Sequence, residues 1–550
     1  MTQRVHRRNF KEFTLSIKKI DFGLLSLFLS ACGSSKSEKM NQKTEIGFLS
    51  DYIPPSSNFE DPDNIDPHFK AFEPVLTDPY WISSLEMDNG DSVVDQILLE
   101  YDRTLNFSFP SSKPDYLPIS ITGWAPSTNT IISASKEVFL NLEEVLDVRI
   151  EETKTSDGSN NFAIAQSIQA NTSGFSYFPN NHYKLGSDVF ISKDYSDPLV
   201  LPSGHTNYDY EVLVHEIGHA LGLKHPFEGD RANLSILNAH EDQTTFTAMS
   251  YNDVPSTFNG TFRSLDWMTL AKFYGVNPEF RSNDDIYLFD DTAGKFIVDG
   301  NGLDTISNAG SDKGAFIDLR PGTHSYEGQK SVYITAAKQL TISHGSDIEN
   351  VQTGSGDDIV IGNSLSNVIK SGDGDDIIFA GEGKDTIYPG AGKDEIDLSE
   401  DLTVKDIIVL EEFNKTEHYD TVYGFCQGIF RDVLDITYLN LPNLTNLPIV
   451  DVLNVPSGYI DSCLVRIFGD GLNNSYDVTD HFRHQGNLEN LKLSSGTQAV
   501  LITSNSQATG EVQNLYSIKQ SSDFIEVHHL AQLVGNYLDI DNWSIDNFLV

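Results

Sequence analysis

A nine-residue repeat between residues 353 and 397 constrains the fold of this chain more than any other feature. Its five units read TGSGDDIVI, GNSLSNVIK, SGDGDDIIF, AGEGKDTIY and PGAGKDEID. In most units, glycine at the second and fourth places permits a tight turn, and every eighth place carries an apolar residue that fills a core. A flexible acidic linker has no reason to keep such a period. The pattern therefore predicts a parallel β-helix whose turns stack on one another.

The sixth place of the repeat predicts calcium binding. An acidic residue there aims a carboxylate at the turn, and calcium takes six to eight oxygen ligands of this kind. The second unit has Leu365 and Asn367 where glycine and aspartate are expected, so we expect weak or no binding there. An isolated segment, residues 299–307, fits the same frame upstream. The predicted calcium ligands are Asp304, Asp358, Asp376, Asp385 and Asp394.

Residues 215–225 read HEIGHALGLKH and predict a metal site. His215 and His219 lie four residues apart, so on a helix both imidazoles can reach one ion. Glu216 projects beside them, where it can take a proton from a water molecule at that ion. Gly222 permits a left-handed turn that brings His225 round as the third ligand. Three protein ligands with an open fourth position are typical of a catalytic zinc site, and a merely apolar helix would not need these offsets.

A second segment, residues 247–251, reads TAMSY. With it the chain resembles the metzincin metalloproteases, in which a methionine turn forms an apolar floor beneath the zinc histidines. The M-S-Y form and the proline after His225 resemble the serralysin branch. The resemblance implies that Met249 forms the floor and that Tyr251 is a displaceable zinc ligand, which can stabilise the developing oxyanion.

The resemblance also implies the fold class: an α+β metzincin catalytic domain, then an all-β calcium-binding parallel β-helix (β-roll) and a β-rich C-terminal region. Apolar spacing predicts strands over residues 104–109, 149–152, 162–167, 174–178 and 187–192. It predicts helices over residues 133–147, from residue 208, and over residues 265–274. Residues 173–178 form a candidate edge strand that could hold an extended peptide, or a plain strand.

Composition and spacing divide the chain into five parts. We expect an export signal at 1–32, a linker or short pro-segment at 33–90, and a zinc metallopeptidase domain at 91–280. A calcium-binding β-roll at 281–400 and a β-rich region with a possible export signal at 401–550 follow.

The N-terminus resembles an export signal. Basic residues precede a mostly apolar stretch, 22–31, which is too short to span a bilayer. It ends L-S-A-C, which resembles the lipobox of bacterial lipoproteins and implies lipidation of Cys32. An ordinary cleaved signal is the alternative. The last residues, 546–550, are similar to the C-terminal export signal of serralysins. Either route places the protein outside the cell or on a bacterial surface.

The net charge limits the partners of this chain, and the cysteine count limits its disulfides. The chain has 80 acidic and 37 basic residues, a formal net charge of −43. Nucleic acids and anionic membranes are poor partners for such a chain, so we expect membrane contact only through a lipid anchor. Three cysteines cannot form a disulfide framework, and whether Cys426 and Cys463 pair stays open.

The sequence therefore predicts an exported, monomeric zinc endopeptidase acting on proteins or peptides, with one catalytic zinc ion and several structural calcium ions. The alternative is a calcium-dependent adhesion or structural surface protein that carries an inert protease-like domain. The intact Glu216 favours the enzyme, because an inert domain has no need of a general base.

Overall fold

The computed structural model describes residues 29–31 and 78–398, apart from 89, 155–159, 170–171, 181–183, 194–207, 230–232 and 255–259. Beyond 398 it describes residues 404–410, 419–425, 432–436, 449–451, 458–460, 464–468, 478–479, 491–493, 498–504, 512–520, 525–534 and 548–549. All three cysteines, including the predicted lipidation site Cys32, lie outside these residues. The chain divides into two compact units: residues 1–282 with 298–300 and 343–346, and residues 283–297, 301–342 and 347–550.

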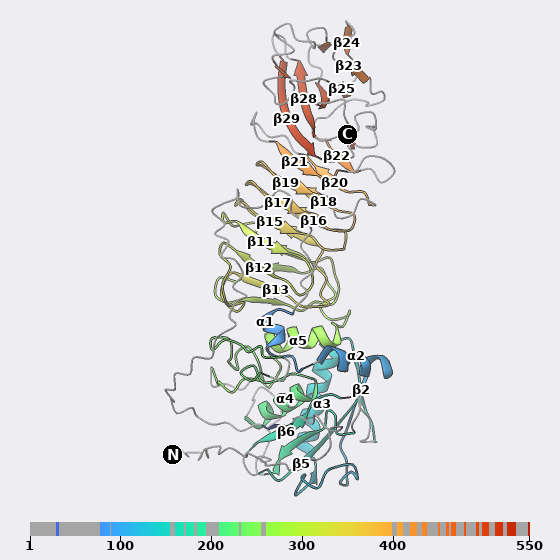
Figure 1. Cartoon of the computed structure of the whole chain (residues 1–550), viewed down its shortest axis with the longest axis vertical. Coiled ribbons are helices and arrows are strands. Elements are labelled where there is room, and N and C mark those ends of the chain that lie inside the picture. The colour runs from blue at the N-terminus through green and yellow to red at the C-terminus, as the bar shows by residue number, and fades with distance from the viewer. Residues whose placement is uncertain are drawn as a thin grey trace, which may run out of the picture. The chain divides into compact units, whose positions relative to one another are not determined.

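A mixed β-sheet forms the framework of the first unit (Figure 1). Its order is β1-β6-β7-β5-β2-β4, with β3 paired to β5. Strands β2, β4, β5 and β7 are parallel, whereas β6 is antiparallel to β7. The five predicted strands are present, each within two residues of its predicted ends. The bounds are β1 Leu29–Ala31, β2 Thr104–Ser108, β3 Ala125–Pro126, β4 Arg149–Glu152, β5 Asn161–Ser167, β6 Gly174–Tyr177 and β7 Val189–Ser192.

Strand β6 is not at the edge of this sheet, contrary to the expectation for residues 173–178. Strand β1 pairs with it antiparallel, with Ser30 opposite Ser176. An outer strand presents unpaired N–H and C=O groups that an extended segment can complete. In this chain, residues 29–31 occupy that position, so β6 pairs with an extended segment of its own chain.

Helices α3 Asn129–Val145, α4 Tyr208–Ala220 and α5 Ser264–Tyr274 pack in the first unit. Helix α3 begins four residues before its predicted start, because Thr128 caps it: its Oγ1 accepts a hydrogen bond from the N–H of Ile131 at 3.3 Å. Its apolar face buries Phe139, which stacks on Phe107 with ring centroids 4.7 Å apart. Helix α4 lies against β6 and β7. Among the described residues, no helix is both long and apolar enough to cross a bilayer.

The linker predicted for residues 33–90 ends too late. Two helices, α1 Tyr80–Ser83 and α2 Gly90–Glu100, pack against α5. Helix α1 and the segment after it are part of the core, since Ile82 and Leu85 are fully buried. The backbone of this segment also bonds the predicted zinc motif: Lys224 N–H donates to the Leu85 carbonyl at 2.7 Å. Residues 78–88 therefore belong to the folded first unit, and the part of the predicted linker before residue 78 lies outside the described residues.

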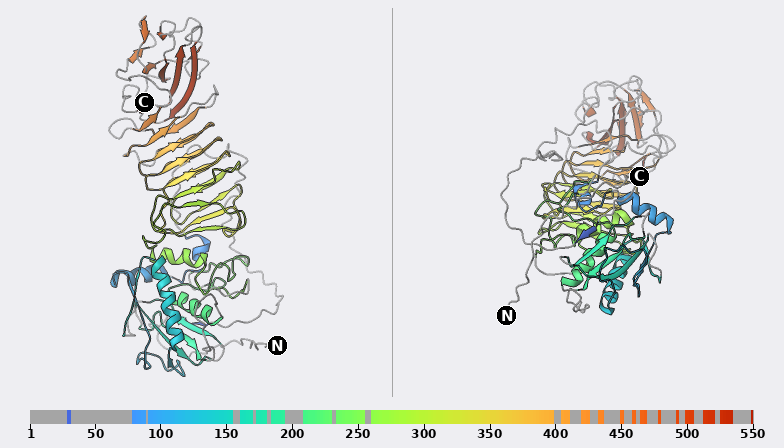
Figure 2. Two further views of the ribbon diagram at one scale, coloured as in Figure 1. Left: turned by 180° about the vertical axis from the view of Figure 1, so that it is seen from behind. Right: turned by 60° about the horizontal axis from the view of Figure 1, so that its bottom comes forward.

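The second unit is built on two mostly parallel sheets, and successive strands of the repeats alternate between them (Figures 1 and 2). One sheet contains β8 Ile286–Leu288, β10 Thr305–Ser307, β14 Asn350–Gln352, β16 Val368–Lys370, β18 Thr386–Tyr388, β20 Ile407–Val409, β22 Val433–Asp435 and β30 Phe548–Leu549. The other contains β9 Lys295–Ile297, β11 Ala315–Asp318, β12 His324–Glu327, β13 Gln339–Ile342, β15 Ile359–Ile361, β17 Ile377–Phe379, β19 Glu395–Asp397, β21 Asp420–Tyr423, β23 Ile449–Asp451, β25 Leu464–Phe468, β27 Gln498–Ser504, β28 Val512–Gln520 and β29 Ile525–Val534. A separate pair joins β24 Gly458–Ile460 to β26 Leu491–Leu493.

The repeats form the core that the sequence predicts. Two nonapeptides make one turn, so Ile378 lies opposite Val360, eighteen residues earlier. The eighth-place side chains fill the interior between the sheets, each worth about 1.5–3 kcal/mol on burial. All five are fully buried: Val360, Ile369, Ile378, Ile387 and Ile396.

The parallel sheets continue past residue 400, where the sequence predicts the end of the β-roll. Strands β20, β21 and β22 extend them in register. An aspartate in each turn still accepts a backbone N–H from the turn before. The sequence separation between the donor and this aspartate grows from 18 residues to 21 and then to 26. None of these turns keeps both glycines of the repeat, because the fourth place is Val404, His418 or Phe430. The repeat pattern therefore does not reveal them. The aspartates are Asp406, Asp420 and Asp432.

Candidate active site

Three histidine side chains from the predicted zinc motif converge in the first unit. His215 and His219 lie on one face of α4. The helix ends at Ala220, and Gly222 has a φ of 106°, in the region that favours glycine. The turn brings His225 back, so that its Nε2 lies 3.2 Å from Nε2 of His215 and 3.1 Å from Nε2 of His219. All three rings are buried.

The opposite ring nitrogens show which atoms face a metal ion. Nδ1 of His215 donates to the Ala248 carbonyl at 2.8 Å, and Nδ1 of His219 donates to the Leu223 carbonyl at 2.6 Å. A carbonyl oxygen only accepts, so both Nε2 atoms present lone pairs. Burial lowers the pKa of His215 to about 3 and holds the pKa of His219 well below its ordinary value. Neutral imidazoles with converging lone pairs are the ligand set that zinc requires.

The third ligand is oriented by a carboxylate. Oε2 of Glu228 lies 3.1 Å from Nδ1 of His225, and this hydrogen bond holds the pKa of Glu228 below its ordinary value. Lys224, the residue before the ligand, is buried and donates to the carbonyls of Ser84, Glu228 and Ser235 at 2.7–2.9 Å. The buried ammonium therefore ties the loop of His225 to the segment after α1. Such contacts fix the direction of a ligand before the metal arrives.

The predicted base, Glu216, follows His215 on α4 and is fully buried. The hydroxyl of Ser176 on β6 donates to Oε2 of Glu216 at 2.9 Å. Gly174 lies on the same face of that strand, and a Cβ there would come within 2.8 Å of Oε1 of Glu216. Strand β6 therefore flanks the carboxylate beside the three converging histidines.

Two residues of the predicted methionine turn, Met249 and Tyr251, lie next to the histidines or to the helix that carries them. The hydroxyl of Tyr251 is 2.9 Å from Nε2 of His225, at the point where the imidazoles meet. Met249 is fully buried, and a Cβ on Gly218 of α4 would come within 2.7 Å of its Sδ. The methionine thus packs directly against the helix that carries the first two ligands, and Gly218 makes room for it.

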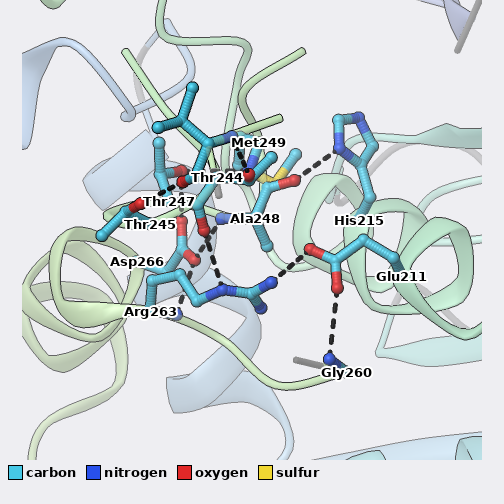
Figure 3. Close-up of polar contacts among 11 residues, drawn as sticks. Glu211, His215, Thr244, Thr245, Thr247, Ala248, Met249, Gly260, Arg263 and Asp266 are labelled. Carbon is cyan, nitrogen blue, oxygen red and sulfur yellow. Dashed lines mark hydrogen bonds and ion pairs between the residues drawn. The ribbon is translucent and has the colours of Figure 1, made fainter. Parts of the chain in front are cut away.

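A buried aspartate holds the methionine turn in place (Figure 3). Asp266 on α5 accepts hydrogen bonds from Oγ1 of Thr247 at 2.6 Å and from the N–H of Ala248 at 2.7 Å. The carbonyl of Ala248 in turn accepts from His215. Burial raises the pKa of Asp266 to about 6 despite these donors. One continuous path of hydrogen bonds therefore links α5 to His215, a predicted metal ligand.

A second buried contact joins α4 to the same region (Figure 3). Glu211, one helical turn before His215, forms an ion pair with Arg263 at 2.5 Å and accepts from the N–H of Gly260 at 3.2 Å. Nε of Arg263 donates to the carbonyl of Thr244 at 3.1 Å. Removing one partner of such a pair would leave a buried charge uncompensated, which typically costs about 3–5 kcal/mol. The pair therefore stabilises the arrangement of α4 relative to the methionine turn.

The predicted calcium ligands form two columns inside the second unit. Asp358, Asp376 and Asp394 each precede a strand of one sheet, whereas Asp304 and Asp385 each precede a strand of the other. One carboxylate oxygen of each aspartate accepts the backbone N–H of a residue one turn earlier, as Asp376 does from Asp358 at 2.8 Å. The other oxygen of Asp358, Asp376 and Asp394 accepts no hydrogen bond within the described part of the chain. Burial raises the pKa of Asp376 to about 9 and that of Asp358 to about 6. Buried carboxylates with an unsatisfied oxygen and neighbouring like charges fit a divalent cation.

In the degenerate repeat, hydrogen bonds within the chain satisfy the side chain at the sixth place, Asn367. Oδ1 of Asn367 accepts from the N–H of Asn363 at 2.9 Å, and its amide donates to the Glu349 carbonyl at 3.0 Å. The neutral amide supplies the donor that an aspartate lacks, which agrees with the expectation of weak calcium binding there. Asp304, in the isolated upstream unit, is also fully buried, and its Oδ1 accepts from the N–H of Asp285 at 2.7 Å.

Comparison with known proteins supports both halves of this description. A family model, the RTX calcium-binding nonapeptide repeat (4 copies), matches residues 361–396. Serralysin of Photorhabdus laumondii is 27% identical over 301 residues, which cover 48% of this chain and 60% of the relative. Serralysin B of Dickeya chrysanthemi is 30% identical over 272 residues, covering 44% and 52%. The chain is a serralysin-like protein with RTX repeats.

A third relative extends the likeness to proteins described as metallopeptidases. Metallopeptidase AprA of Pseudomonas marginalis is 28% identical over 251 residues, covering 40% of this chain and 51% of the relative. The serralysin-like chain thus spans about half the length of the curated relatives it matches. A protease domain with a β-roll fits these relatives and the two units of the structure.

Proposed function

We propose that this chain is a zinc-dependent endopeptidase that hydrolyses peptide bonds in protein substrates. The observation that carries the proposal is the convergence of three buried imidazoles next to a buried glutamate, with the Tyr251 hydroxyl at the same point. The likeness to serralysins supports it. An inert domain would have no need to keep both the ligands and the base in this arrangement.

Each residue of the site has a distinct role in this proposal. Zinc, when bound by His215, His219 and His225, polarises the scissile carbonyl and lowers the pKa of water. Glu216 takes the proton from the attacking water and donates it to the leaving amine. The hydroxyl of Tyr251 donates a hydrogen bond to the developing oxyanion. In this proposal the substrate replaces β1 as the extended strand beside β6, and the antiparallel pairing of β1 supports that mode of binding.

Calcium ions stabilise the second unit in this proposal. Several ions bind between successive turns, at the two columns that include Asp304, Asp358, Asp376, Asp385 and Asp394. The buried carboxylates and the matching repeat family support this placement. Ions that join adjacent turns stabilise stacking as well as the individual loops.

The test of the enzymatic proposal uses the full chain with zinc and calcium present. We expect cleavage of a degenerate peptide library, loss of cleavage on treatment with a zinc-selective chelator, and recovery when zinc is returned. A calcium-containing buffer throughout separates zinc loss from unfolding of the repeats. Cleavage that persists in a zinc-free protein, or a fully zinc-loaded protein that cleaves no peptide, would contradict the proposal.

We further propose that the enzyme acts outside the cytoplasm, anchored through acyl chains on Cys32. The L-S-A-C end of the N-terminal apolar stretch supports the anchor, and the two acyl modifications of a lipoprotein suffice for stable attachment. We expect wild type in the envelope fraction of an expressing bacterium and Cys32→Ser in the medium. Equal amounts of both proteins in the medium would rule out the anchor and favour release as a soluble protease.

A further inference from the structure

The hydroxyl of Ser176 is placed where it can set the orientation of the base. Ser176 is at the third position of β6 and is fully buried, as is Glu216. Its Oγ lies 2.9 Å from Oε2 of Glu216. A buried carboxylate binds a hydroxyl donor more strongly than water-exposed groups do, because no solvent competes for either atom. This hydrogen bond therefore limits rotation of the carboxylate.

The neighbouring glycine limits the same rotation by contact. Side chains two residues apart on a strand point to the same face, so Gly174 and Ser176 both face Glu216. A Cβ on Gly174 would lie 2.7 Å from Cγ and 3.0 Å from Cδ of Glu216. The glutamate thus occupies space that only glycine leaves open, and the serine two residues later provides the hydrogen bond. Strand β6 fixes the position of the base on two sides.

The outer edge of β6 is the place where an extended segment pairs. In the described structure Ser30 of β1 lies opposite Ser176, so the residue whose side chain bonds the base also has its backbone next to the paired segment. A segment that pairs along the whole edge bonds the outward N–H and C=O groups of the strand, and these bonds hold its backbone in place. Any displacement of the backbone at residue 176 moves the hydroxyl that holds Glu216.

We propose that Ser176 is a positioning residue that couples pairing of the substrate along β6 to the orientation of Glu216. The inference rests on the proposed endopeptidase function. It assigns to Ser176 a contribution to kcat rather than to binding, since the hydroxyl contacts the base and not the peptide. It also predicts that peptides long enough to pair along all of β6 gain in kcat as well as in affinity.

The test compares Ser176→Ala with wild type on a series of peptides of increasing length. We expect kcat to fall by about 10- to 100-fold, the range for a small misplacement of a reacting group, with KM nearly unchanged. The rise of kcat with peptide length should be present in wild type and absent in the alanine variant. Ser176→Thr, which keeps the hydroxyl, should recover much of the lost kcat.

A matched control is Ser135→Ala, which removes a buried hydroxyl of α3 that bonds the carbonyl of Ile131 at 2.8 Å. It should keep the wild-type kcat and zinc content. An unchanged kcat in Ser176→Ala, or an effect on KM alone, would overturn the role of Ser176 while leaving the proposed function intact. A wild-type chain that cleaves no peptide would instead overturn the proposed function, and the role of Ser176 with it.

Discussion

A Glu216→Gln variant is expected to bind zinc like wild type and to lose peptide-bond cleavage by about 10²–10⁴-fold, the usual contribution of a general acid–base group. The amide has nearly the same size as the carboxylate but cannot take a proton. No metal ligand is removed, because the three Nε2 atoms that converge belong to histidines. The carbonyl oxygen of the new amide can still accept the hydrogen bond from Ser176, so the fold around it should persist.

The measurement is zinc content by elemental analysis together with kcat/KM on a single peptide. His225→Ala serves as the contrasting variant, since it should lose zinc and activity together. A Glu216→Gln protein that cleaves at a rate near that of wild type would refute the assignment of the base. Loss of zinc from this variant would show that Glu216 supports the metal site rather than the proton transfer.

Removal of calcium is expected to unfold the repeats, the largest structural effect that we predict. The buried carboxylates of Asp358, Asp376 and Asp394 come from adjacent turns, and they repel one another when they are ionised without a cation. Burial is the main reason that the pKa of Asp376 rises to about 9, and the charges of Asp394 and Asp358 add to it. Circular dichroism during a calcium titration should show β-structure forming with the metal. A spectrum and melting temperature indifferent to calcium would contradict this prediction.

The same aspartates give the calcium-free protein an unusual dependence on pH. Their pKa values are higher in the folded chain than the ordinary value of about 3.9, so folding favours their protonated form. The metal-free solenoid should therefore be most stable below about pH 4, and should lose that stability as pH rises through the folded pKa values of about 6 for Asp358 and about 9 for Asp376. At higher pH calcium should restore the stability of the solenoid, because it binds the ionised carboxylates.

Two variants test which repeat units respond to calcium. Asp376→Ala should weaken the response to calcium more than Asn367→Ala, because Asn367 already satisfies its neighbours through hydrogen bonds. Equal effects of the two substitutions would mean that the degenerate unit binds calcium after all. Melting curves at pH 5 and pH 8, each with and without a chelator, provide the measurement.

The parts of the site that the sequence predicts are those set by local spacing. A spacing of four residues on a helix brings His215 and His219 to one face, and Gly222 can adopt the positive φ that the turn requires. The eighth place of each nonapeptide is buried for the same reason: a fixed period places it on one face of a strand. In both cases the relation spans fewer than about ten residues, so a linear pattern suffices to reveal it.

Contacts between distant segments could not be predicted in this way. Ser176 and Glu216 are 40 residues apart, and Glu211 and Arg263 are 52 apart. Nothing in the residues near Ser176 distinguishes it from any other strand serine. The sequence does not predict the packing of α1, because a short helix after a polar stretch has no strong pattern of its own. Its burial depends on α5.

The sequence alone predicts the chemistry of the two sites, since the ligand types, the candidate base and the nine-residue period are all local properties of the chain. The groups around them are visible only in the folded chain: the hydroxyl on Glu216, the carboxylate on His225, the ion pair of Glu211 with Arg263, and the extension of the solenoid past residue 400. A hydrogen bond or an ion pair depends on distance in space, and sequence spacing does not record that distance when turns vary in length. The last turns of the solenoid are an example, because their hydrogen-bonded aspartates lie 21 and 26 residues apart.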